Sequence, residues 1–323
     1  MNDPRCRETR FRWARRVSRV FMDNAVPGSR GLGRVVTDVV LPAPTGPEVV
    51  PSLFGFSLWV DPLQGGIIDA VLYRDGVYEI GTCDVARALL REGDVVVDAG
   101  AHIGWFTLAA ATLVGERGRV VAFEPAADAF RILERNVALN GLRNVVAVPR
   151  ALGAGPDARH LYHPLPADRA LASLVEPARW AERETVTVVT LDASLASAGI
   201  DRVAMLKIDV EGWEADVLAG ARSLLSREDG PAISVELDRS DPAGAEVFDM
   251  LRSVNRYRVF RRRRGKGSVS RFLEISRSVD LPERDNLYAF LPHHLPLVGP
   301  GRVGVRSLSR AGVRSSGPAP GGR

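Results

Sequence analysis

The central part of the chain alternates short, continuous apolar runs with longer segments in which apolar residues recur every three to four positions. The short runs are typical of strands buried on both faces, as in a parallel sheet whose crossovers are helices. The longer segments are typical of helices with one apolar face. Strands are predicted at residues 95–98, 119–124, 144–149, 185–190, 203–209 and 232–237, and helices at 105–114, 126–140, 213–225 and 246–254. The pattern therefore predicts an α/β fold with a doubly wound, mostly parallel sheet.

Three other segments complete the domain that we expect at residues 51–291. Residues 54–80 carry Asp-Pro, Gly-Gly and Asp-Gly turn signals between apolar runs, which predicts short strands and a hairpin before the next helix. Residues 153–183 contain four prolines and form a long insertion, which we expect to act as a lid over a binding site. Residues 256–260 and 286–290 are expected to pair as a closing antiparallel ribbon.

Both ends of the chain lie outside this domain. Residues 1–50 begin with arginines interleaved with apolar residues and continue into a linker rich in proline and glycine. We favour a short basic helix packed on the domain, or a frayed and partly disordered end. The alternative is peripheral contact with an anionic membrane. Residues 292–323 are rich in Pro, Gly, Ser and Arg and are expected to be a disordered tail.

Composition narrows the compartment and the partners. The formal net charge is +4 and the isoelectric point is about 9.4, and almost all of the basic residues are arginines. This balance does not by itself predict nucleic acid as a partner. The two cysteines cannot form a disulfide framework, and no apolar run reaches the ~18 residues of a membrane helix. We therefore expect a cytoplasmic enzyme.

A glycine-containing turn joins strand 95–98 to helix 105–114. Its sequence is Asp98-Ala-Gly100-Ala-His102-Ile-Gly104. Gly100 lets the backbone turn sharply next to a ligand, and open α/β sheets bind ligands beyond the carboxyl ends of their strands. The turn departs from the G-x-G-x-x-G spacing of dinucleotide sites, and the Asp98 carboxylate would repel a pyrophosphate. The same carboxylate suits the cationic methyl donor S-adenosylmethionine (SAM).

An acidic residue, Glu124, closes the next strand about 20 residues beyond Gly104. A carboxylate at this position accepts hydrogen bonds from ribose hydroxyls. Dinucleotide sites and SAM sites both use such an acid. Glu124 therefore indicates that a nucleoside binds, but it does not distinguish SAM from a dinucleotide. The alternative is a solvated acid in front of Pro125.

A run of charged residues follows strand 203–209, with the sequence Lys207-Ile-Asp209-Val-Glu211-Gly212-Trp-Glu214. Charges beside a core are costly unless they are paired or functional. Asp209 and Glu211 are therefore candidate catalytic residues. Lys207 shares the strand phase of Asp209 and is expected to orient it. Glu214 in the first helical turn is either a helix-end effect or a functional residue.

These motifs resemble those of the FkbM-type methyltransferases, a branch of the class I SAM-dependent fold. The resemblance rests on Val97–Thr107, Phe123–Pro125, Thr190–Asp192 and Leu206–Glu214, and it spans roughly residues 54–291. It implies a Rossmann-like, mostly parallel sheet of seven strands with an N-terminal strand and helix extension. It also implies SAM contacts from Asp98, Gly100, Gly104 and Glu124, with His102 in the cofactor loop where the family usually has Asn.

The resemblance implies methyl transfer from SAM to a hydroxyl of a small acceptor, such as a sugar, a polyketide or another natural product. The alternatives are an NAD(P)-dependent oxidoreductase and a non-catalytic nucleotide-binding scaffold. A general base assists an alcohol nucleophile, for which Asp209 or Glu211 is best placed and His160 and His163 are minor candidates. Asp209 and Glu211 could bind a metal ion, but no His/Cys cluster supports zinc, and no metal site is predicted. The oligomeric state stays open. The arginine run 261–264 is a solvated hairpin loop, which we favour, or a site for an anionic acceptor group.

Overall fold

The centre of the molecule is an eight-stranded sheet, seen in a computed structural model that describes residues 11, 41, 43–164, 171–238 and 243–298. Five neighbouring strands are parallel, and the three at one end run antiparallel to their neighbours. In spatial order the strands are β12 (Phe272–Ile275), β11 (Arg258–Arg262), β13 (Arg284–Phe290), β10 (Ala232–Asp238), β9 (Met205–Ile208), β3 (Val95–Ala99), β4 (Arg119–Phe123) and β5 (Val145–Val148). The predicted doubly wound, mostly parallel sheet is confirmed, and β12 adds an edge strand to the seven expected.

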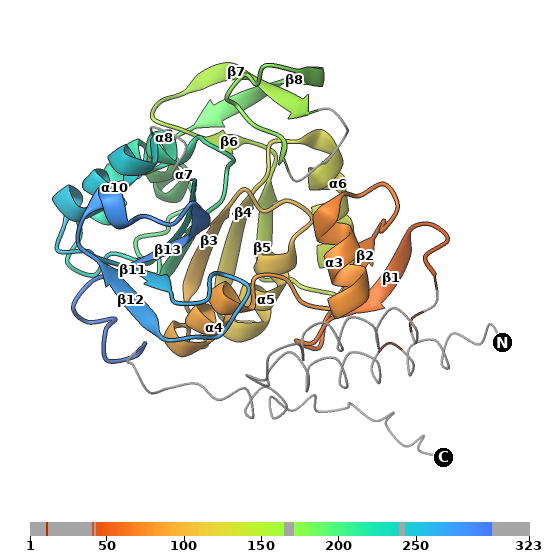
Figure 1. The fold of residues 1–323 in the computed structure, drawn as a ribbon, viewed down its shortest axis with the longest axis horizontal. Helices are drawn as coiled ribbons and strands as arrows, with labels where there is room; N and C mark the ends of the chain where they lie inside the picture. Colours follow the sequence, from red (N-terminus) through yellow and green to blue (C-terminus); the bar gives the residue numbers. More distant parts are fainter. Residues whose placement is uncertain (1–10, 12–40, 42, 165–170, 239–242, 299–323) are drawn as a thin grey trace, which may run out of the picture.

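Helices cover both faces of this sheet (Figure 1). Successive strand residues point to opposite faces: Val96 and Met205 join one apolar cluster, while Val97 and Leu206 join the other. This double burial explains why the strands are continuous apolar runs. The first cluster includes α4 (Ile80–Leu89) and α5 (Trp105–Val114), and the second includes α7 (Leu191–Ser197), α8 (Glu214–Ala219), α9 (Arg222–Leu225) and α10 (Ala243–Val254).

The segment before the sheet differs from the prediction. A hairpin is present, but it is formed by β1 (Glu48–Pro51) and β2 (Ser57–Val60), and the chain then forms helix α3 (Ile67–Asp75). The Asp-Gly signal at residues 75–76 is the end of this helix, because Gly76 has φ 66° and its amide donates to the Leu72 carbonyl at 2.9 Å. Of the basic N-terminal stripe, residues 1–10 and 12–40 lie outside the described residues.

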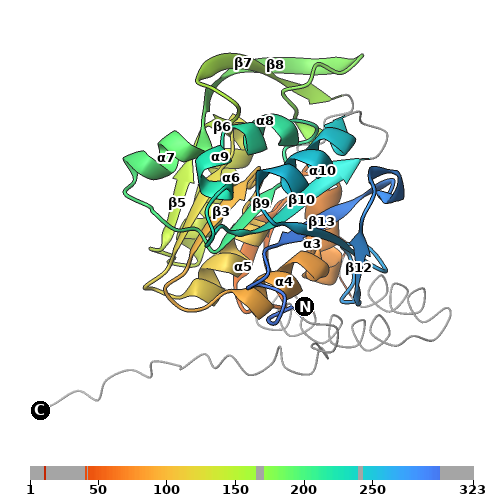
Figure 2. The ribbon, with the colours of Figure 1, turned by 90° about the vertical axis from the view of Figure 1, so that its left-hand side faces the viewer.

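The predicted insertion is a small sheet of its own. Strand β7 (Asp157–Pro164) pairs antiparallel with β8 (Trp180–Val189), and β8 pairs in parallel with β6 (Ala151–Leu152). This sheet lies across the top of the domain, above the ends of the central strands (Figure 2). Helix α6 (Ala127–Leu139) lies on β5. It also holds β2, because Asn136 and Asn140 at its C-terminal end accept hydrogen bonds from β2 backbone amides at 2.7 and 2.8 Å.

The C-terminal part confirms one prediction and corrects two. Strands β11 and β13 form the expected antiparallel pair. The predicted helix 213–225 is divided at Gly220, where a Cβ would lie 2.0 Å from the Gly153 carbonyl oxygen. Residues 292–298 are not a disordered tail, since Leu295 and Val298 pack against the core; residues 299–323 lie outside the described part. Among the described helices, none is long and apolar enough to cross a membrane.

Candidate active site

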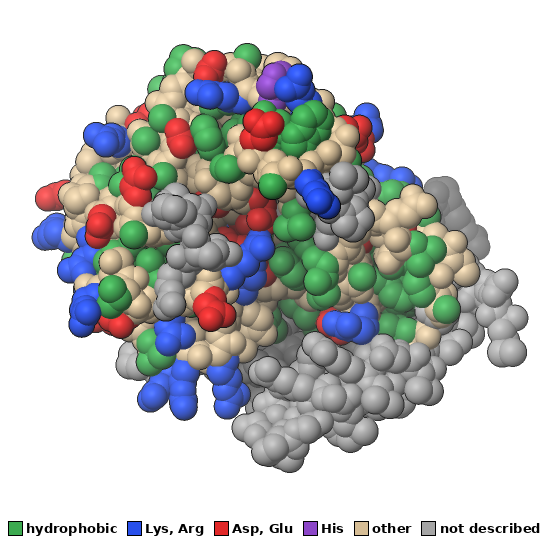
Figure 3. Space-filling view, turned by 45° about the horizontal axis from the view of Figure 1, so that its top comes forward, with side chains coloured by type: hydrophobic (Ala, Val, Ile, Leu, Met, Phe, Trp, Pro, Cys, Tyr) green, Lys and Arg blue, Asp and Glu red, His purple; other side chains and the backbone are tan. Residues whose placement is uncertain are grey.

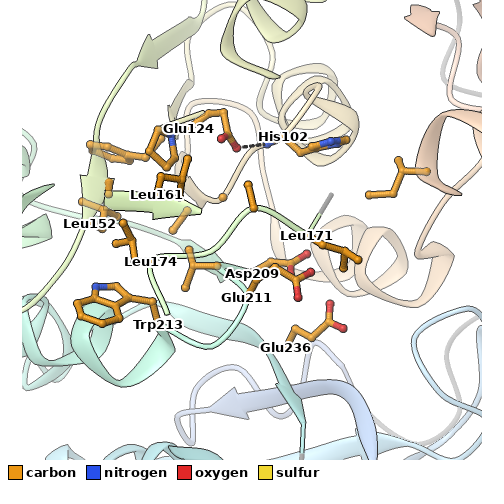
Figure 4. A pocket seen from close by; sticks show the side chains of 18 of the residues that line it. His102, Glu124, Leu152, Leu161, Leu171, Leu174, Asp209, Glu211, Trp213 and Glu236 are labelled. Atoms are coloured by element: carbon orange, nitrogen blue, oxygen red, sulfur yellow. Dashed lines mark hydrogen bonds between the residues drawn. The ribbon is translucent and has the colours of Figure 1, made fainter. Parts of the chain in front are cut away.

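A cavity of about 320 Å³ lies at the carboxyl ends of β3, β4, β9 and β10. Open α/β sheets bind ligands at this edge, and the volume lies in the range of small-molecule sites. Acidic and basic side chains gather in the hollow, with hydrophobic side chains beside it (Figure 3). The floor is charged and includes Asp209, Glu211 and Glu236. The opposite wall is apolar and includes Leu152, Leu161, Leu174 and Trp213 (Figure 4).

The turn after β3 needs its glycines for packing. Gly100 lines the cavity and has φ 78°, and a Cβ on it would lie 1.8 Å from the Asp209 carbonyl oxygen. Glycine is therefore required because the loops that follow β3 and β9 touch. Gly104 has φ 92°, and its Cβ would lie 2.7 Å from the Leu133 side chain, so it allows α5 to approach α6. Gly104 does not reach the cavity wall, whereas His102 does.

The Asp98 carboxylate lies behind the turn and not in the cavity. The residue is fully buried, Thr107 donates to its Oδ2 at 2.6 Å, and the Lys207 Nζ lies 3.9 Å from its Oδ1. Burial raises the pKa of Asp98 to about 6, although Lys207 and Thr107 favour the ionised form. The carboxylate does not line the cavity, because strand β3 ends one residue later and the side chain still points into the packed layer. Its predicted contact with SAM stays a prediction.

Glu124 lies at the cavity wall with a fixed carboxylate. Its Oε2 accepts a hydrogen bond from the His102 amide at 2.7 Å, and its Oε1 accepts one from the Ala126 amide at 2.9 Å. Burial raises the pKa of Glu124 to about 7, and the two amides offset part of this. Each oxygen keeps a second lone pair, so the carboxylate can still accept hydroxyl hydrogen bonds from the cavity side.

Asp209 and Lys207 form an ion pair at the end of β9, in which Lys207 is buried and Asp209 is partly exposed. The Lys207 Nζ donates to the Asp209 Oδ2 at 2.9 Å. Burial alone would raise the pKa of Asp209, but Lys207 and Lys266 outweigh it and lower the pKa to about 2. Asp209 lines the cavity, whereas Lys207 supports it from behind. Asp209 is therefore a permanently charged carboxylate and a weak base.

Glu211 has the opposite electrostatic character. Burial and the Asp209 charge raise its pKa to about 8, and Arg284 offsets part of this by donating to both carboxylate oxygens at 2.8 and 2.9 Å. Its backbone has φ 52°, which is uncommon for a residue with a side chain. Glu214 instead accepts hydrogen bonds from the Val210 and Gly212 amides at 3.3 and 3.1 Å, so it holds the loop that carries Glu211.

Four charged residues of the site escaped the sequence analysis. Glu236 at the end of β10 accepts from Arg284 at 2.7 Å and from Lys266 at 2.5 Å, and Lys266 also lies 2.7 Å from Glu79. Lys266, Arg284 and Glu236 line the cavity beside Glu211. A signal was available for Glu236, because it places a charge in the predicted strand 232–237, most of whose residues are apolar. Lys266 lies in the loop after the predicted strand 256–260, and Arg284 lies two residues before the predicted strand 286–290.

One oxygen each of Glu79, Asp209 and Glu236 lies within 4.8 Å of the others, a spacing that can hold a cation. The Lys266 ammonium already contacts two of these three carboxylates. A metal ion at this place would have to compete with the Lys266 ammonium for the same carboxylates. The prediction that the protein uses no metal stays a prediction.

The remaining candidates lie outside the cavity. His163 pairs with Glu184 at 2.9 Å, and His160 lies 3.4 Å from the Thr185 hydroxyl. Neither histidine lines the cavity wall. The arginine run is not wholly solvated, because Arg262 is buried and donates to Asp84 at 2.6 Å.

The chain is similar to known methyltransferases. The sequence profile of the Methyltransferase FkbM domain matches residues 98–262, just over half of the chain. The 31-O-demethyl-FK506 methyltransferase FkbM of Streptomyces tacrolimicus is 35% identical over 196 residues, which cover 50% of this chain and 72% of that protein. Methyltransferase sdnD of Sordaria araneosa is 30% identical over 190 residues, which cover 50% of this chain and 70% of that protein.

A crystal structure of methyltransferase FkbM from Methylobacillus flagellatus KT aligns with 87% of this chain and 59% of that chain, at 15% identity and a TM-score of 0.41. The assignment rests on the profile match and on the two relatives from Streptomyces and Sordaria. The chain belongs to the FkbM methyltransferase family.

Proposed function

We propose that the chain binds SAM in the cavity and transfers its methyl group to a hydroxyl of a small-molecule acceptor. The observation that carries this proposal is the Glu124 carboxylate, which two backbone amides fix at the cavity wall beside the turn after β3. Family membership supports the methyl-transfer chemistry, and it sets aside the NAD(P)-dependent oxidoreductase. The relative from Streptomyces is named for an O-demethyl compound, which supports oxygen as the acceptor atom.

The cofactor half of the cavity is the part at the ends of β3 and β4. Glu124 would accept the ribose hydroxyls, while Gly100 and His102 would line the nucleoside and methionine portions. When bound, SAM supplies an electrophilic methyl group on a sulfonium. Asp98 would contribute indirectly, since its carboxylate anchors Thr107 and faces Lys207 beneath the turn. Gly104 would contribute through the packing of α5.

The acceptor half is the part at the ends of β9 and β10. Of the two carboxylates predicted to be catalytic, Glu211 is the better general base, because its pKa of about 8 is close to neutral pH. Asp209, with a pKa of about 2, would orient the acceptor as a hydrogen-bond acceptor. Lys207 would hold Asp209 in place through the 2.9 Å contact. Positioning of this kind supplies much of the rate of an in-line displacement.

The insertion after β5 would serve as a lid. Leu171, Ala172 and Leu174 line the cavity, and the Ser173 hydroxyl donates to the Glu211 carbonyl at 2.5 Å. The segment therefore crosses from the β7–β8 sheet to the loop of the proposed base. Closing such a segment over the site excludes water and strengthens the local electrostatics.

Titration calorimetry with S-adenosylhomocysteine (SAH), SAM and NAD tests the proposal. The wild-type chain should bind SAH and SAM but not NAD. Glu124→Ala should weaken SAH binding by at least about tenfold, because a charged hydrogen-bond acceptor is worth about 1.5–3 kcal/mol. Asp128→Ala, an exposed acid on the helix that follows, is the matched control and should leave binding unchanged. Binding of NAD alone, or equal SAH binding by Glu124→Ala, contradicts the assignment.

A further inference from the structure

A lysine lies at the centre of the acidic cluster in the acceptor half of the cavity. The Lys266 Nζ is 2.5 Å from Glu236 and 2.7 Å from Glu79, and the oxygens of these two residues lie within 4.8 Å of an Asp209 oxygen. Lys266 also lines the cavity, beside Tyr78 and Arg284. An ammonium with three carboxylates around it and an open side toward the cavity is placed to act on a bound acceptor.

The backbone of Lys266, which carries this ammonium, is fixed from two directions. The Lys266 amide donates to Asp285 at 2.7 Å, and its carbonyl accepts from the Gly81 amide at 2.9 Å. Gly81 makes this contact because it lacks a Cβ, which would lie 2.7 Å from the same carbonyl oxygen. Burial alone would lower the pKa of Lys266, but Glu79, Asp209 and Glu236 outweigh it and raise the pKa. The charge is therefore permanent and preorganised.

We propose that Lys266 is the resident cation of the acceptor half, and that it occupies the place among Glu79, Asp209 and Glu236 where a divalent metal ion would otherwise bind. The proposal rests on the proposed function for the location of the acceptor. A cation at this position lowers the cost of negative charge on the acceptor oxygen, which is one role of metal ions in hydroxyl chemistry. Lysine supplies this charge without a metal.

The proposed step balances as follows. The acceptor hydroxyl gives its proton to a carboxylate of the site, and its oxygen forms the new bond to the methyl carbon. The bond from that carbon to sulfur breaks, and its electron pair stays on sulfur. Lys266 keeps its protons throughout and only stabilises the charge that develops on oxygen. Glu79 and Lys266 both lie outside residues 98–262, so the family match does not include this pair.

Binding of Mn²⁺ to the full chain tests the proposal, with electron paramagnetic resonance and thermal melts as readouts. Lys266→Ala should bind Mn²⁺ at least about a hundredfold more tightly than wild type, because the variant loses the positive charge that repels a cation from the three carboxylates. Lys266→Ala should also melt at a lower temperature than wild type, and Mn²⁺ should restore part of the difference. Adding Glu236→Gln should abolish the new Mn²⁺ binding. Arg264→Ala removes an exposed cation from the same loop and should behave as wild type.

The outcomes separate this proposal from the cofactor assignment. The proposal is overturned if Mn²⁺ raises the melting temperature of the wild-type chain. It is also overturned if Lys266→Ala folds but does not bind Mn²⁺. The wild-type melt decides the point even where Lys266→Ala does not fold. SAH binding, measured in the same samples, should be unchanged by Lys266→Ala; a loss confined to this variant would assign Lys266 to the cofactor half and overturn the proposal. Absence of SAH binding in every sample would count against the cofactor assignment, while the Mn²⁺ data still decide the cation.

Discussion

Nucleoside binding should depend on pH through Glu124. The carboxylate is buried at the cavity wall and its pKa is raised to about 7. Ribose hydroxyls donate to the ionised form, so a bound nucleoside favours ionisation and lowers the pKa in the complex. Binding should therefore weaken as the pH falls through 7, and complex formation should release protons.

The size of the effect follows from the pKa. With a pKa near 7, about nine-tenths of the free protein carries protonated Glu124 at pH 6 and about one-tenth at pH 8. The affinity should fall about tenfold from pH 8 to pH 6, which is about 1.4 kcal/mol. About half a proton should be released per ligand at pH 7. The unliganded protein shows the opposite trend, because a raised carboxyl pKa costs roughly 3 kcal/mol of stability as the pH rises from 4.5 to 7.

Titration calorimetry with 5′-methylthioadenosine isolates this end of the cavity, since the ligand has no amino acid group that titrates between pH 6 and 8. Repeating the titration in buffers of different ionisation enthalpy counts the released protons. Glu124→Gln should remove the pH dependence. Glu214→Gln is the matched control, because burial raises the pKa of Glu214 to about 7 as well, but its carboxylate holds a loop and does not line the cavity. A wild-type affinity that is flat from pH 6 to 8, or a slope that survives in Glu124→Gln, refutes the reasoning.

Three further substitutions test the packing around the site. Gly100→Ala should destabilise the chain by about 1–3 kcal/mol more than Gly93→Ala in urea unfolding. Both glycines have positive φ, but only Gly100 has no room for a Cβ. Equal losses of stability in the two variants would contradict this. Arg262→Met should cost about 3 kcal/mol, since it leaves the buried Asp84 without its guanidinium partner, and the double variant with Asp84→Asn should recover most of that loss in the same assay. Ser173→Ala removes the hydrogen bond from the lid to the loop after β9. One neutral hydrogen bond is worth about 1 kcal/mol, so the variant should release SAH about fivefold faster in stopped-flow tryptophan fluorescence. An unchanged release rate would argue against the lid.

The elements that the sequence predicts best are those that the core buries most completely. Strand β3, strand β4 and helix α5 lie within a residue of their predicted bounds, because burial on both sheet faces imposes a continuous apolar run. Helix α3 was missed because the same Asp-Gly pair that makes a hairpin turn also ends a helix. Local turn chemistry does not separate these uses, and only the hydrogen bond from Gly76 back to Leu72 decides between them.

The cofactor side of the candidate site could be predicted in part from the sequence. Gly100, His102 and Glu124 reach the cavity wall as expected, because they follow the ends of adjacent parallel strands. Asp98 does not, since one further residue of strand leaves it in the buried layer between Thr107 and Lys207. A shift of one residue at a strand end therefore changes a direct contact into an indirect one.

On the acceptor side, Asp209 and Glu211 were predicted, but Arg284 and Lys266 were missed for a topological reason. A search for functional residues at the carboxyl ends of parallel strands ignores an antiparallel strand, whose amino end lies at that same edge. Strand β13 is such a strand: it pairs antiparallel with β10, so Arg284 at its start comes beside the end of β10 and contacts Glu236. Lys266 reaches the same edge from the loop after β11.

The family match covers the cofactor half but only part of the acceptor half. Gly100, Glu124 and Asp209 lie inside residues 98–262, whereas Lys266 and Arg284 follow it. Under the proposed function the methyl donor is common to the family and the acceptor is not, so the cofactor half should tolerate little change and the acceptor half should vary among members. Function carried on variable segments over a constant scaffold is a general property of such folds. Acceptor specificity should therefore be sought first in residues that the family profile does not cover, and Lys266, which contacts the carboxylates of Glu79 and Glu236, is the first candidate among them.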